Sequence, residues 1–284
     1  MYGQKFKALR LQQHISLEQA ANRVISPSTL SRWENNKIDI RFNLVIKLLD
    51  NIHINLKEFT NYCKINHSNP FVAKVAVYYE ANDDRHILQL IQSKKKEYQN
   101  SHNQFDLLLL AIACNCYYDL TDNNVFPVSY QKKLFYILSN IEYWTEMYIN
   151  VFGNTVFLYN SKELYSISIR ILKNLNSNTF NDFQEYYYAL SSVINALTAL
   201  IIKNPKLASQ LLTKIEKVSI PKPISYLKIR TNVLKYLLDY RLGKTDEKLI
   251  SIKLENLKWL GLTDIAKDLT FFFNRIKNDR SPLS

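Results

Sequence analysis

The sequence predicts an all-α protein with two parts, a small N-terminal domain of short helices and a longer array of helical hairpins. Three observations support this prediction. Glycine and proline are scarce, at 4 and 7 of 284 residues, whereas nucleotide-binding α/β folds use glycine in their loops. Hydrophobic residues make up 47% of the chain, which is enough for a sizeable core. Apolar residues also recur at helical spacing along most of the length.

The first 60 residues contain five short amphipathic segments separated by short loops. We expect helices over residues 2–14, 17–24, 26–35, 41–52 and 55–63. In the first of these, Phe6, Leu9 and Leu11 are expected to point inward. Short helices joined by short loops predict a compact helical domain.

Two of these helices carry clear start signals. Ser16 is a good N-cap, and Gln19 at the third helical position completes a capping box. Ser26 is a second N-cap, and Pro27 occupies the first position of the third helix.

The third helix has two different faces. At about 100° per residue, Leu30 and Trp33 point one way and a small polar face points the other. The polar face consists of Ser28, Ser31, Arg32 and Asn35. Ala20 and Ala21 of the second helix are small where two helices must approach closely. The pair therefore meets the requirements of a helix-turn-helix, whose second helix enters the major groove of DNA.

From residue 71 onward the predicted helices are longer. They cover residues 71–82, 84–99, 105–120, 130–153, 161–175, 180–203, 205–218, 223–244, 247–261 and 263–277. Successive pairs recur about every 35–45 residues, which is the spacing of helical hairpin repeats, without a strict consensus. This pattern predicts a degenerate solenoid. Residues 65–70 are the expected linker, so the predicted domains are 1–64 and 71–284.

The charge is concentrated at the N-terminus. The chain has a formal net charge of +12. Residues 1–64 carry 10 lysines and arginines against 5 acidic residues, a higher density of surplus charge than in the rest. A module that binds phosphates is expected to be basic, although a basic chain can also be merely soluble.

Several classes of protein and site are excluded. The sequence contains no glycine-rich phosphate loop, nucleophile elbow or histidine spacing typical of a metal site, so we expect neither an enzyme nor a metal or cofactor. Cys63, Cys114 and Cys116 are too few and too poorly spaced for a disulfide framework and are expected to be reduced. Without a signal peptide or an apolar run of about 18 residues, a cytoplasmic location is expected.

The DNA contacts follow from the helix-turn-helix. The helix N-termini at Ser16 and Ser26 present backbone N–H groups to phosphates. Arg32 can bond a guanine edge with both arms of its guanidinium. The remaining candidates, for bases or phosphates, are Arg10, Ser28, Thr29, Lys37 and Arg41. The alternative is a helical hairpin whose polar face is only solvated.

The stretch "SLEQAANRVISPSTLSRWENNKIDI" resembles the Xre-type helix-turn-helix as it occurs in the Rgg family of transcriptional regulators. That family commonly shows S-L-x-x-A-A followed by S-x-S-x-L-S-R-F-E-x-G-E. The matching positions are Ser16, Leu17, Ala20, Ala21, Ser26, Ser28, Leu30, Ser31, Arg32 and Glu34. Trp33, Asn36 and Lys37 depart from the pattern. Asn36 is a mild departure, because asparagine tolerates the left-handed region.

The resemblance implies DNA contacts at the start of the third helix, which here means Ser28, Thr29 and Arg32. It extends loosely to the ending "LENLKWLGLTDIAKDL", similar to the last hairpin of the family. It also implies a tetratricopeptide-like C-terminal domain that dimerises and binds short secreted peptides after their import.

A peptide groove requires apolar pockets together with amide or guanidinium groups for the peptide backbone. Polar residues inside apolar helices are therefore the candidates. Asn195 is the foremost, and the others are Arg170, Tyr188, Tyr226, Arg230 and Asn232. For each of them the alternative is a capping or interhelical hydrogen bond.

The function expected from these features is a transcriptional regulator controlled by a short hydrophobic signalling peptide, as in quorum sensing. We expect a homodimer on a palindromic operator with half-sites about 34 Å apart. The peptide would shift the two DNA-binding domains or change contacts with RNA polymerase. The alternative is a constitutive DNA-binding repressor whose helical domain only dimerises or docks a protein partner.

Overall fold

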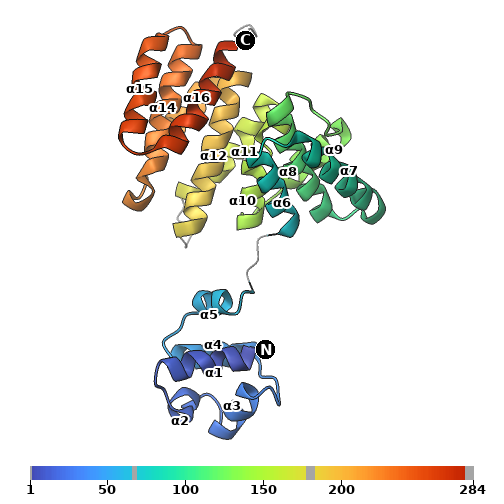
Figure 1. Cartoon of the computed structure of the whole chain (residues 1–284), viewed down its shortest axis with the longest axis vertical. Coiled ribbons are helices and arrows are strands. Elements are labelled where there is room, and N and C mark those ends of the chain that lie inside the picture. The colour runs from blue at the N-terminus through green and yellow to red at the C-terminus, as the bar shows by residue number, and fades with distance from the viewer. Residues whose placement is uncertain (1, 66–68, 177–182, 279–284) are drawn as a thin grey trace. The chain divides into compact units, whose positions relative to one another are not determined.

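The computed structural model describes residues 2–65, 69–176 and 183–278, and every regular element within these ranges is a helix. The expected all-α fold is confirmed. The chain divides into two compact units, Met1–Pro70 and Phe71–Ser284 (Figure 1). Within the expected linker, residues 66–68 lie outside the described ranges.

The N-terminal unit contains five helices in the predicted order. They are α1 (Tyr2–Gln12), α2 (Leu17–Ala21), α3 (Pro27–Glu34), α4 (Phe42–Asn51) and α5 (Leu56–Tyr62). Their apolar faces share one core, in which Phe6, Leu30 and Leu48 are fully buried. The prediction for Leu11 was wrong, because this side chain is 54% exposed on the outer side of α1.

Left-handed residues end most of these helices and keep them short. The second helix was expected to reach residue 24 but ends at Ala21, and Arg23 adopts a φ of 57°. Asn36, which follows α3, has a φ of 56°. The expectation that asparagine would occupy a left-handed turn at this position is confirmed.

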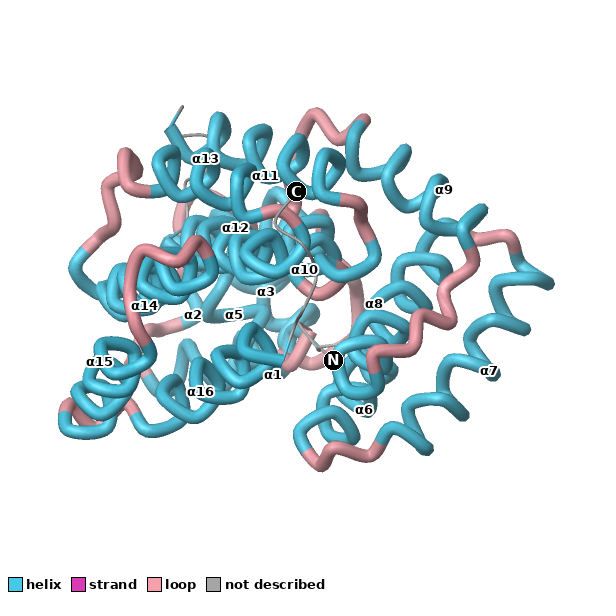
Figure 2. Tube along the Cα trace, turned by 90° about the horizontal axis from the view of Figure 1, so that it is seen from above, coloured by secondary structure: helices cyan, strands magenta, loops and turns pink. Residues whose placement is uncertain are grey.

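The C-terminal unit contains the longer helices. They are α6 (Pro70–Glu80), α7 (Asp84–Ser101), α8 (Gln104–Thr121), α9 (Val128–Ser139), α10 (Glu146–Gly153), η1 (Val156–Leu158), α11 (Ser161–Asn176), α12 (Phe183–Lys203), α13 (Pro205–Ile215), η2 (Lys222–Ile224), α14 (Ser225–Arg241), α15 (Glu247–Trp259) and α16 (Thr263–Asn278). In Figure 2 these helices follow a curved path with α7 and α15 at its two ends. The central helix α12 packs against α10, α11, α13 and α14.

One predicted helix of this unit was wrong. Residues 130–153 do not form a continuous helix but divide into α9 and α10. The chain leaves the helical path between them because Asn140 caps the end of α9 and the Arg170 guanidinium of α11 binds the carbonyl of Ile141 at 2.5 Å. Trp144 in the connection is buried in the core.

Smaller differences concern helix ends. The segment predicted over 223–244 begins as the short helix η2, and α14 ends at Arg241, before Gly243 with a φ of 71°. The expected start of the 180–203 helix falls on residues 180–182, which lie outside the described ranges. None of the described helices is long and apolar enough to cross a membrane.

Candidate DNA interface and ligand-binding residues

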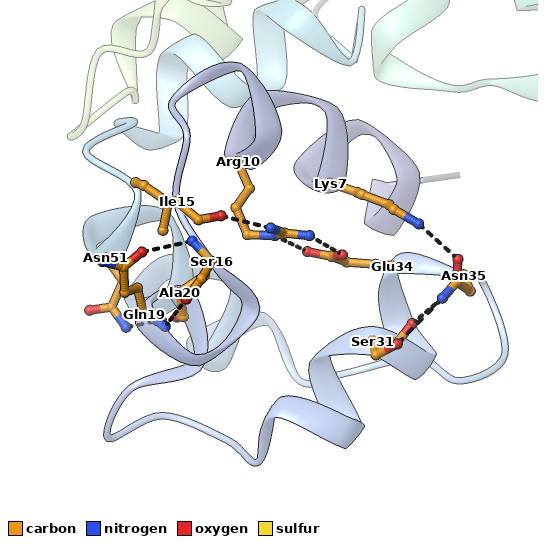
Figure 3. Close-up of polar contacts among 10 residues, drawn as sticks. All are labelled: Lys7, Arg10, Ile15, Ser16, Gln19, Ala20, Ser31, Glu34, Asn35 and Asn51. Carbon is orange, nitrogen blue, oxygen red and sulfur yellow. Dashed lines mark hydrogen bonds and ion pairs between the residues drawn. The ribbon is translucent and has the colours of Figure 1, made fainter.

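A buried ion pair fixes α3 on α1. Arg10 is 4% exposed and Glu34 is 1% exposed. The Arg10 Nε donates to Glu34 Oε1 at 2.7 Å and its Nη2 donates to Oε2 at 2.9 Å (Figure 3). Its Nη1 donates to the carbonyl of Ile15 at 2.7 Å. The assignment of Arg10 as a phosphate contact was therefore wrong, because its guanidinium is buried and hydrogen-bonded inside the domain.

The backbones of α1 and α3 also approach each other closely. A Cβ on Gly3 would lie 2.1 Å from the carbonyl oxygen of Trp33, so only glycine fits at this position of α1. The rings of Phe6 and Trp33 lie 5.2 Å apart between centroids. The inward face of α3 is thus tightly held, which leaves its other face outside.

Both predicted N-caps are present. Ser16 Oγ accepts from the Gln19 amide at 3.1 Å, and the Gln19 side chain accepts from the Ser16 amide at 2.8 Å. At the start of α3, Ser26 Oγ accepts from the Thr29 amide at 3.1 Å and also contacts the hydroxyls of Ser28 and Thr29. The structure therefore gathers three candidate hydroxyls at the N-terminus of α3.

Three cations of the candidate set have no side-chain partner among the described residues. Arg32, Lys37 and Arg41 are exposed, and their side chains form no hydrogen bond or ion pair with any residue in the described ranges. Arg32 lies in the last turn of α3, Lys37 just beyond it, and Arg41 at the N-cap of α4. They are the positive groups of this unit's candidate set that remain available to an anionic partner.

Sequence reasoning missed the residue that fixes the turn after α2. Asn51, at the end of α4, donates from Nδ2 to the carbonyls of Ala20 and Asn22 at 2.9 and 3.0 Å. These two carbonyls lie at the C-terminus of α2, where helix carbonyls lack intrahelical partners. An asparagine on the last turn of a helix was the available signal, but its partner is 29–31 residues away.

In the helical unit, Asn195 forms an interhelical bond. Its Nδ2 donates to the carbonyl of Gly153 at 3.1 Å, which joins α12 to the end of α10. A Cβ on Gly153 would lie 2.9 Å from Cβ of Ser192, so the two helices approach closely here. Asn195 is half-buried, and its side-chain oxygen accepts no hydrogen bond from a residue in the described part of the chain.

Tyr188 and Tyr226 lie in one aromatic group, and the residue that joins them is Tyr187. The ring of Tyr187 lies 5.3 Å from that of Tyr188 and 5.8 Å from that of Tyr226. The Tyr226 hydroxyl donates to the Tyr187 hydroxyl. Burial raises the pKa of Tyr226, and the bond to Tyr187 raises it further.

Arg230 belongs to the same group. Burial lowers the pKa of its guanidinium, and the opposing influence of Tyr226, Asp268 and Tyr187 offsets this only in part. The Arg230 side chain is half-buried, so solvent still reaches part of it. Arg230 forms no hydrogen bond or ion pair with any residue that the structure describes.

The structure does not bring the other two candidates to this group. Asn232 is exposed and lies two positions after Arg230, about 160° away around α14. Arg170 holds the Ile141 carbonyl between α9 and α10, as described above. Neither residue therefore belongs to the group of Tyr188 and Tyr226, Asn232 because of its face and Arg170 because its guanidinium binds a carbonyl elsewhere.

Sequence reasoning also missed a second polar cluster, around a cavity of about 330 Å³. Lys203 Nζ donates to the carbonyls of Phe157 and Tyr159, both at 2.6 Å. Burial, together with the nearby Arg275, lowers the pKa of Lys203 to about 8. Arg275 of α16 pairs with Asp119 and Asp122 of the α8 end at 2.6 and 2.5 Å. No local pattern in the sequence links these residues.

Comparison with protein families gives two matches. Residues 6–59 match the helix-turn-helix family, and residues 88–270 match the C-terminal domain of the HTH-type transcriptional regulator Rgg. The second match alone spans more than half of the chain. No curated protein matches the sequence.

Solved structures with the same fold cover nearly the whole chain. The SHP pheromone receptor Rgg2 of Streptococcus dysgalactiae is 17% identical, with a TM-score of 0.75 over 97% of this chain and 99% of that one. The PrgX/cCF10 complex is 16% identical, with a TM-score of 0.71 over 100% and 94%. A bacterial peptide pheromone/receptor complex is 16% identical, with a TM-score of 0.68 over 98% and 99%. At these identities the likeness shows the fold.

Proposed function

We infer that this chain, which belongs to the Rgg family of HTH-type transcriptional regulators, reads operator DNA with α3 and is controlled by a short peptide bound to its helical unit. The observation that supports DNA reading is that the candidate cations of the N-terminal unit differ in burial and pairing. Arg10 is buried and paired with Glu34, whereas Arg32, Lys37 and Arg41 are exposed and unpaired among the described residues. The chain is a regulator and not an enzyme.

Each predicted DNA contact has a distinct role in this proposal. The N-termini of α2 and α3, at Ser16 and Ser26, direct backbone amides at phosphates. Ser28 and Thr29 contact a base or phosphate. Arg32 reads a guanine edge, and the remaining cations, Lys37 and Arg41, bind the backbone.

The first test measures DNA affinity. Genomic fragments selected on the full-length protein supply the operator, and fluorescence anisotropy then compares wild type with Arg32→Ala at one fixed salt concentration. We expect the operator Kd to rise about 5–150-fold, from the loss of about 1–3 kcal/mol of base discrimination, with little change on random DNA. Lys47→Ala, which removes one exposed charge from α4 outside the contact set, is the control. Unchanged operator affinity in Arg32→Ala would show that α3 does not read the bases.

The expected homodimer also belongs to this proposal. A palindromic operator with half-sites about 34 Å apart requires two copies of α3 related by a two-fold axis. Sedimentation of the protein on a one-site and a two-site DNA duplex measures the stoichiometry. One chain on the two-site duplex would contradict the dimer.

The peptide site is proposed for the helical unit of residues 71–284, with residues 1–64 as the DNA-binding domain. The family match and the pheromone receptors of the same fold support it, and so does the group of Tyr188, Tyr226 and Arg230. Asn195 remains a candidate through its side-chain oxygen. Peptide binding would alter either the placement of the DNA-binding domains or contacts with RNA polymerase.

Calorimetric titration tests this part. Short hydrophobic peptides encoded beside the gene are titrated into wild type, Asn195→Ala and Arg230→Ala. Micromolar binding that either substitution weakens would support the proposal. Absence of binding together with intact operator binding would favour the alternative, a constitutive repressor whose helical domain dimerises or docks a protein partner.

A further inference from the structure

The cavity around Lys203 lies where four elements of the helical unit meet. Its lining comes from α8 and the residue that ends it, η1, α12 and α16, and its volume is about 330 Å³. Phe157, Ala199 and Ile202 form an apolar wall, and the exposed Asp122 and Asn278 also line the cavity, so it opens to solvent. Ligand pockets typically measure about 300–1,000 Å³. This cavity lies at the small end of that range and has room for one end of a peptide.

The cavity contains a positive charge that is not paired with a carboxylate. Its charged lining residues are Lys203, Arg275 and Asp122. Arg275 and Asp122 form an ion pair at 2.5 Å, and Arg275 also pairs with Asp119 at 2.6 Å. Lys203 is half-buried, and its ammonium donates to two neutral backbone carbonyls, both at 2.6 Å. Its third N–H has no acceptor in the described part of the chain, so it is available to an anionic atom.

A line of half-buried side chains on α12 leads to this cavity. From one end of the line to the other, the remaining residues of α12 are all buried. The half-buried residues follow one another at intervals of three or four positions, so they share one face of the helix. This line, called the α12 stripe below, consists of Tyr188, Ser191, Asn195, Thr198 and Ile202. Ile202 also lines the cavity, so the α12 stripe ends there.

The middle of the α12 stripe offers hydrogen-bonding groups to a peptide backbone. The Ser191 hydroxyl has no partner among the residues that the structure describes. The side-chain oxygen of Asn195 is unused, because this residue bonds Gly153 through Nδ2. The Thr198 hydroxyl donates to the carbonyl of Ile194 at 3.0 Å and can still accept a hydrogen bond. These groups can bind the amides and carbonyls of an extended chain.

The length of the α12 stripe fits a short peptide. Tyr188 and Ile202 are 14 positions apart on one helix, which corresponds to about 21 Å at a rise of 1.5 Å per residue. An extended chain advances about 3.3–3.6 Å per residue, so the α12 stripe matches about six peptide residues.

We propose that the cavity holds the C-terminal residue of the regulating peptide, with the terminal carboxylate on the Lys203 ammonium. The inference rests on the peptide-controlled function proposed above and names the end of the peptide that the site recognises. A C-terminal residue carries an apolar side chain and a carboxylate on one Cα. The side chain packs against Phe157 and Ile202, and the carboxylate accepts a charge-assisted hydrogen bond from Lys203. The preceding residues lie along the α12 stripe toward Tyr188.

The experiment offers the full-length protein four pools of synthetic hexapeptides with random apolar residues. The first pool has free C-termini, and the second has amidated C-termini. The third is amidated and contains one aspartate, and the fourth has a free C-terminus that is always glycine. Peptides retained at equilibrium are quantified by mass spectrometry, and the strongest binders of each pool are remeasured one at a time by fluorescence anisotropy.

The variants separate the charge from the space that the cavity provides. Lys203→Met removes the ammonium and keeps an apolar side chain of similar length. Ile202→Trp leaves Lys203 in place and fills the cavity from its half-buried edge. Lys206→Met is the matched control, because Lys206 is an exposed cation at the start of α13 and does not line the cavity.

We expect wild type to prefer the first pool over the second by about 10–150-fold, as for a hydrogen bond to a charged group. It should prefer the first pool over the fourth by about 10-fold or more, because glycine leaves the apolar wall uncovered. Lys203→Met should lose the preference for a free C-terminus and still bind amidated peptides with the affinity of wild type. Ile202→Trp should bind the first pool at least 10-fold more weakly, and Lys206→Met should behave as wild type.

Other outcomes distinguish this inference from the function on which it rests. Equal enrichment of the first two pools by wild type would overturn the C-terminal assignment and leave the peptide function standing. An equal preference for the aspartate pool would overturn it too, because an acidic side chain would then serve as well. Enrichment of no pool would count against the peptide function itself. If Lys203→Met also loses amidated peptides or unfolds at a lower Tm, Ile202→Trp decides, and unchanged binding of the first pool by Ile202→Trp would overturn the inference.

Discussion

Arg10 and Arg230 are the same side chain in two opposite situations, one in each unit. Arg10 is almost completely buried and makes three hydrogen bonds, two of them to the carboxylate of Glu34. Arg230 is only half-buried, and its guanidinium forms no hydrogen bond or ion pair with any described residue. A buried charge that the protein satisfies itself fixes a structure. A half-buried charge that no described residue pairs is a candidate for ligand recognition. Arg10 therefore stabilises the N-terminal unit, whereas Arg230 is a residue of the helical unit that we propose for ligand binding.

The largest loss of stability is expected when Arg10 loses its partner Glu34. Glu34→Ala leaves the Arg10 guanidinium buried with only the Ile15 carbonyl, and breaking a buried pair in this way costs about 3–5 kcal/mol. We expect the N-terminal unit to unfold at lower urea concentration, as measured by hydrogen exchange of residues in α1 and α3 of the full chain.

The double variant Arg10→Met with Glu34→Leu is the control for this prediction. Replacing both charges with apolar groups of similar volume is expected to recover much of the lost stability. A Glu34→Ala protein that unfolds at the urea concentration of wild type would contradict the structural role of the pair.

A second, smaller effect is expected where α1 meets the end of α3. Gly3→Ala places a methyl group 2.1 Å from the Trp33 carbonyl oxygen, so the helices must separate. Overpacking of this kind costs about 1–3 kcal/mol. Urea unfolding followed by hydrogen exchange in the same unit measures the loss. Gly261→Ala, at a site with nothing within 4 Å but a φ of 77°, tests backbone strain without a clash, and its effect should be confined to the helical unit.

Lys203 is intermediate between the two arginines, because it has carbonyl acceptors but no carboxylate of its own. Its pKa falls from 10.5 in the unfolded chain to about 8 in the folded one. Between these values the unfolded chain binds more protons, so stability rises with pH from about 8 toward 10.5. The contribution approaches about 1.4 kcal/mol per pH unit at most.

Urea midpoints of wild type and Lys203→Met, compared at several pH values from 7 to 10, isolate this contribution. We expect the stability of wild type relative to Lys203→Met to be constant below about pH 8 and to increase above it. A constant difference over the whole range would mean that Lys203 titrates normally in the folded state.

The smallest expected effect is that of Asn232, which we compare with Arg230 on the same helix, α14. Asn232 is exposed about 160° from Arg230 on α14, so Asn232→Ala should change stability by less than about 0.5 kcal/mol. It should also leave peptide affinity unchanged, while Arg230→Met lowers it. Weaker peptide binding by Asn232→Ala would place the site on the outer face of α14. It would contradict the proposal that Tyr226 and Arg230 bind the peptide.

The sequence by itself determined the helical fold, the five N-terminal helices and both predicted caps. These are local properties. Helical periodicity extends over a few turns, and a cap such as Ser16 is satisfied three residues away at Gln19. The outward face of α3 followed for the same reason, since Leu30 and Trp33 fix which side is buried.

The partners of charged residues were decided by the tertiary structure. Arg10 continues the apolar stripe of Phe6 on α1, and Glu34 continues that of Leu30 on α3, so periodicity could have predicted that both are buried. It could not pair them, because they lie 24 positions apart and meet only when the helices pack. The same limit explains the break before α10, where Arg170 binds a carbonyl 29 positions away.

Arg230 shows the limit most clearly. The sequence placed a guanidinium in an apolar helix but could not tell whether another part of the chain would neutralise it. Tyr226 lies one turn before Arg230 on α14, whereas its partner Tyr187 comes from α12, 39 positions earlier than Tyr226. Desolvation and the choice of partners depend on everything within a few ångströms of a group, and those neighbours are fixed only by packing.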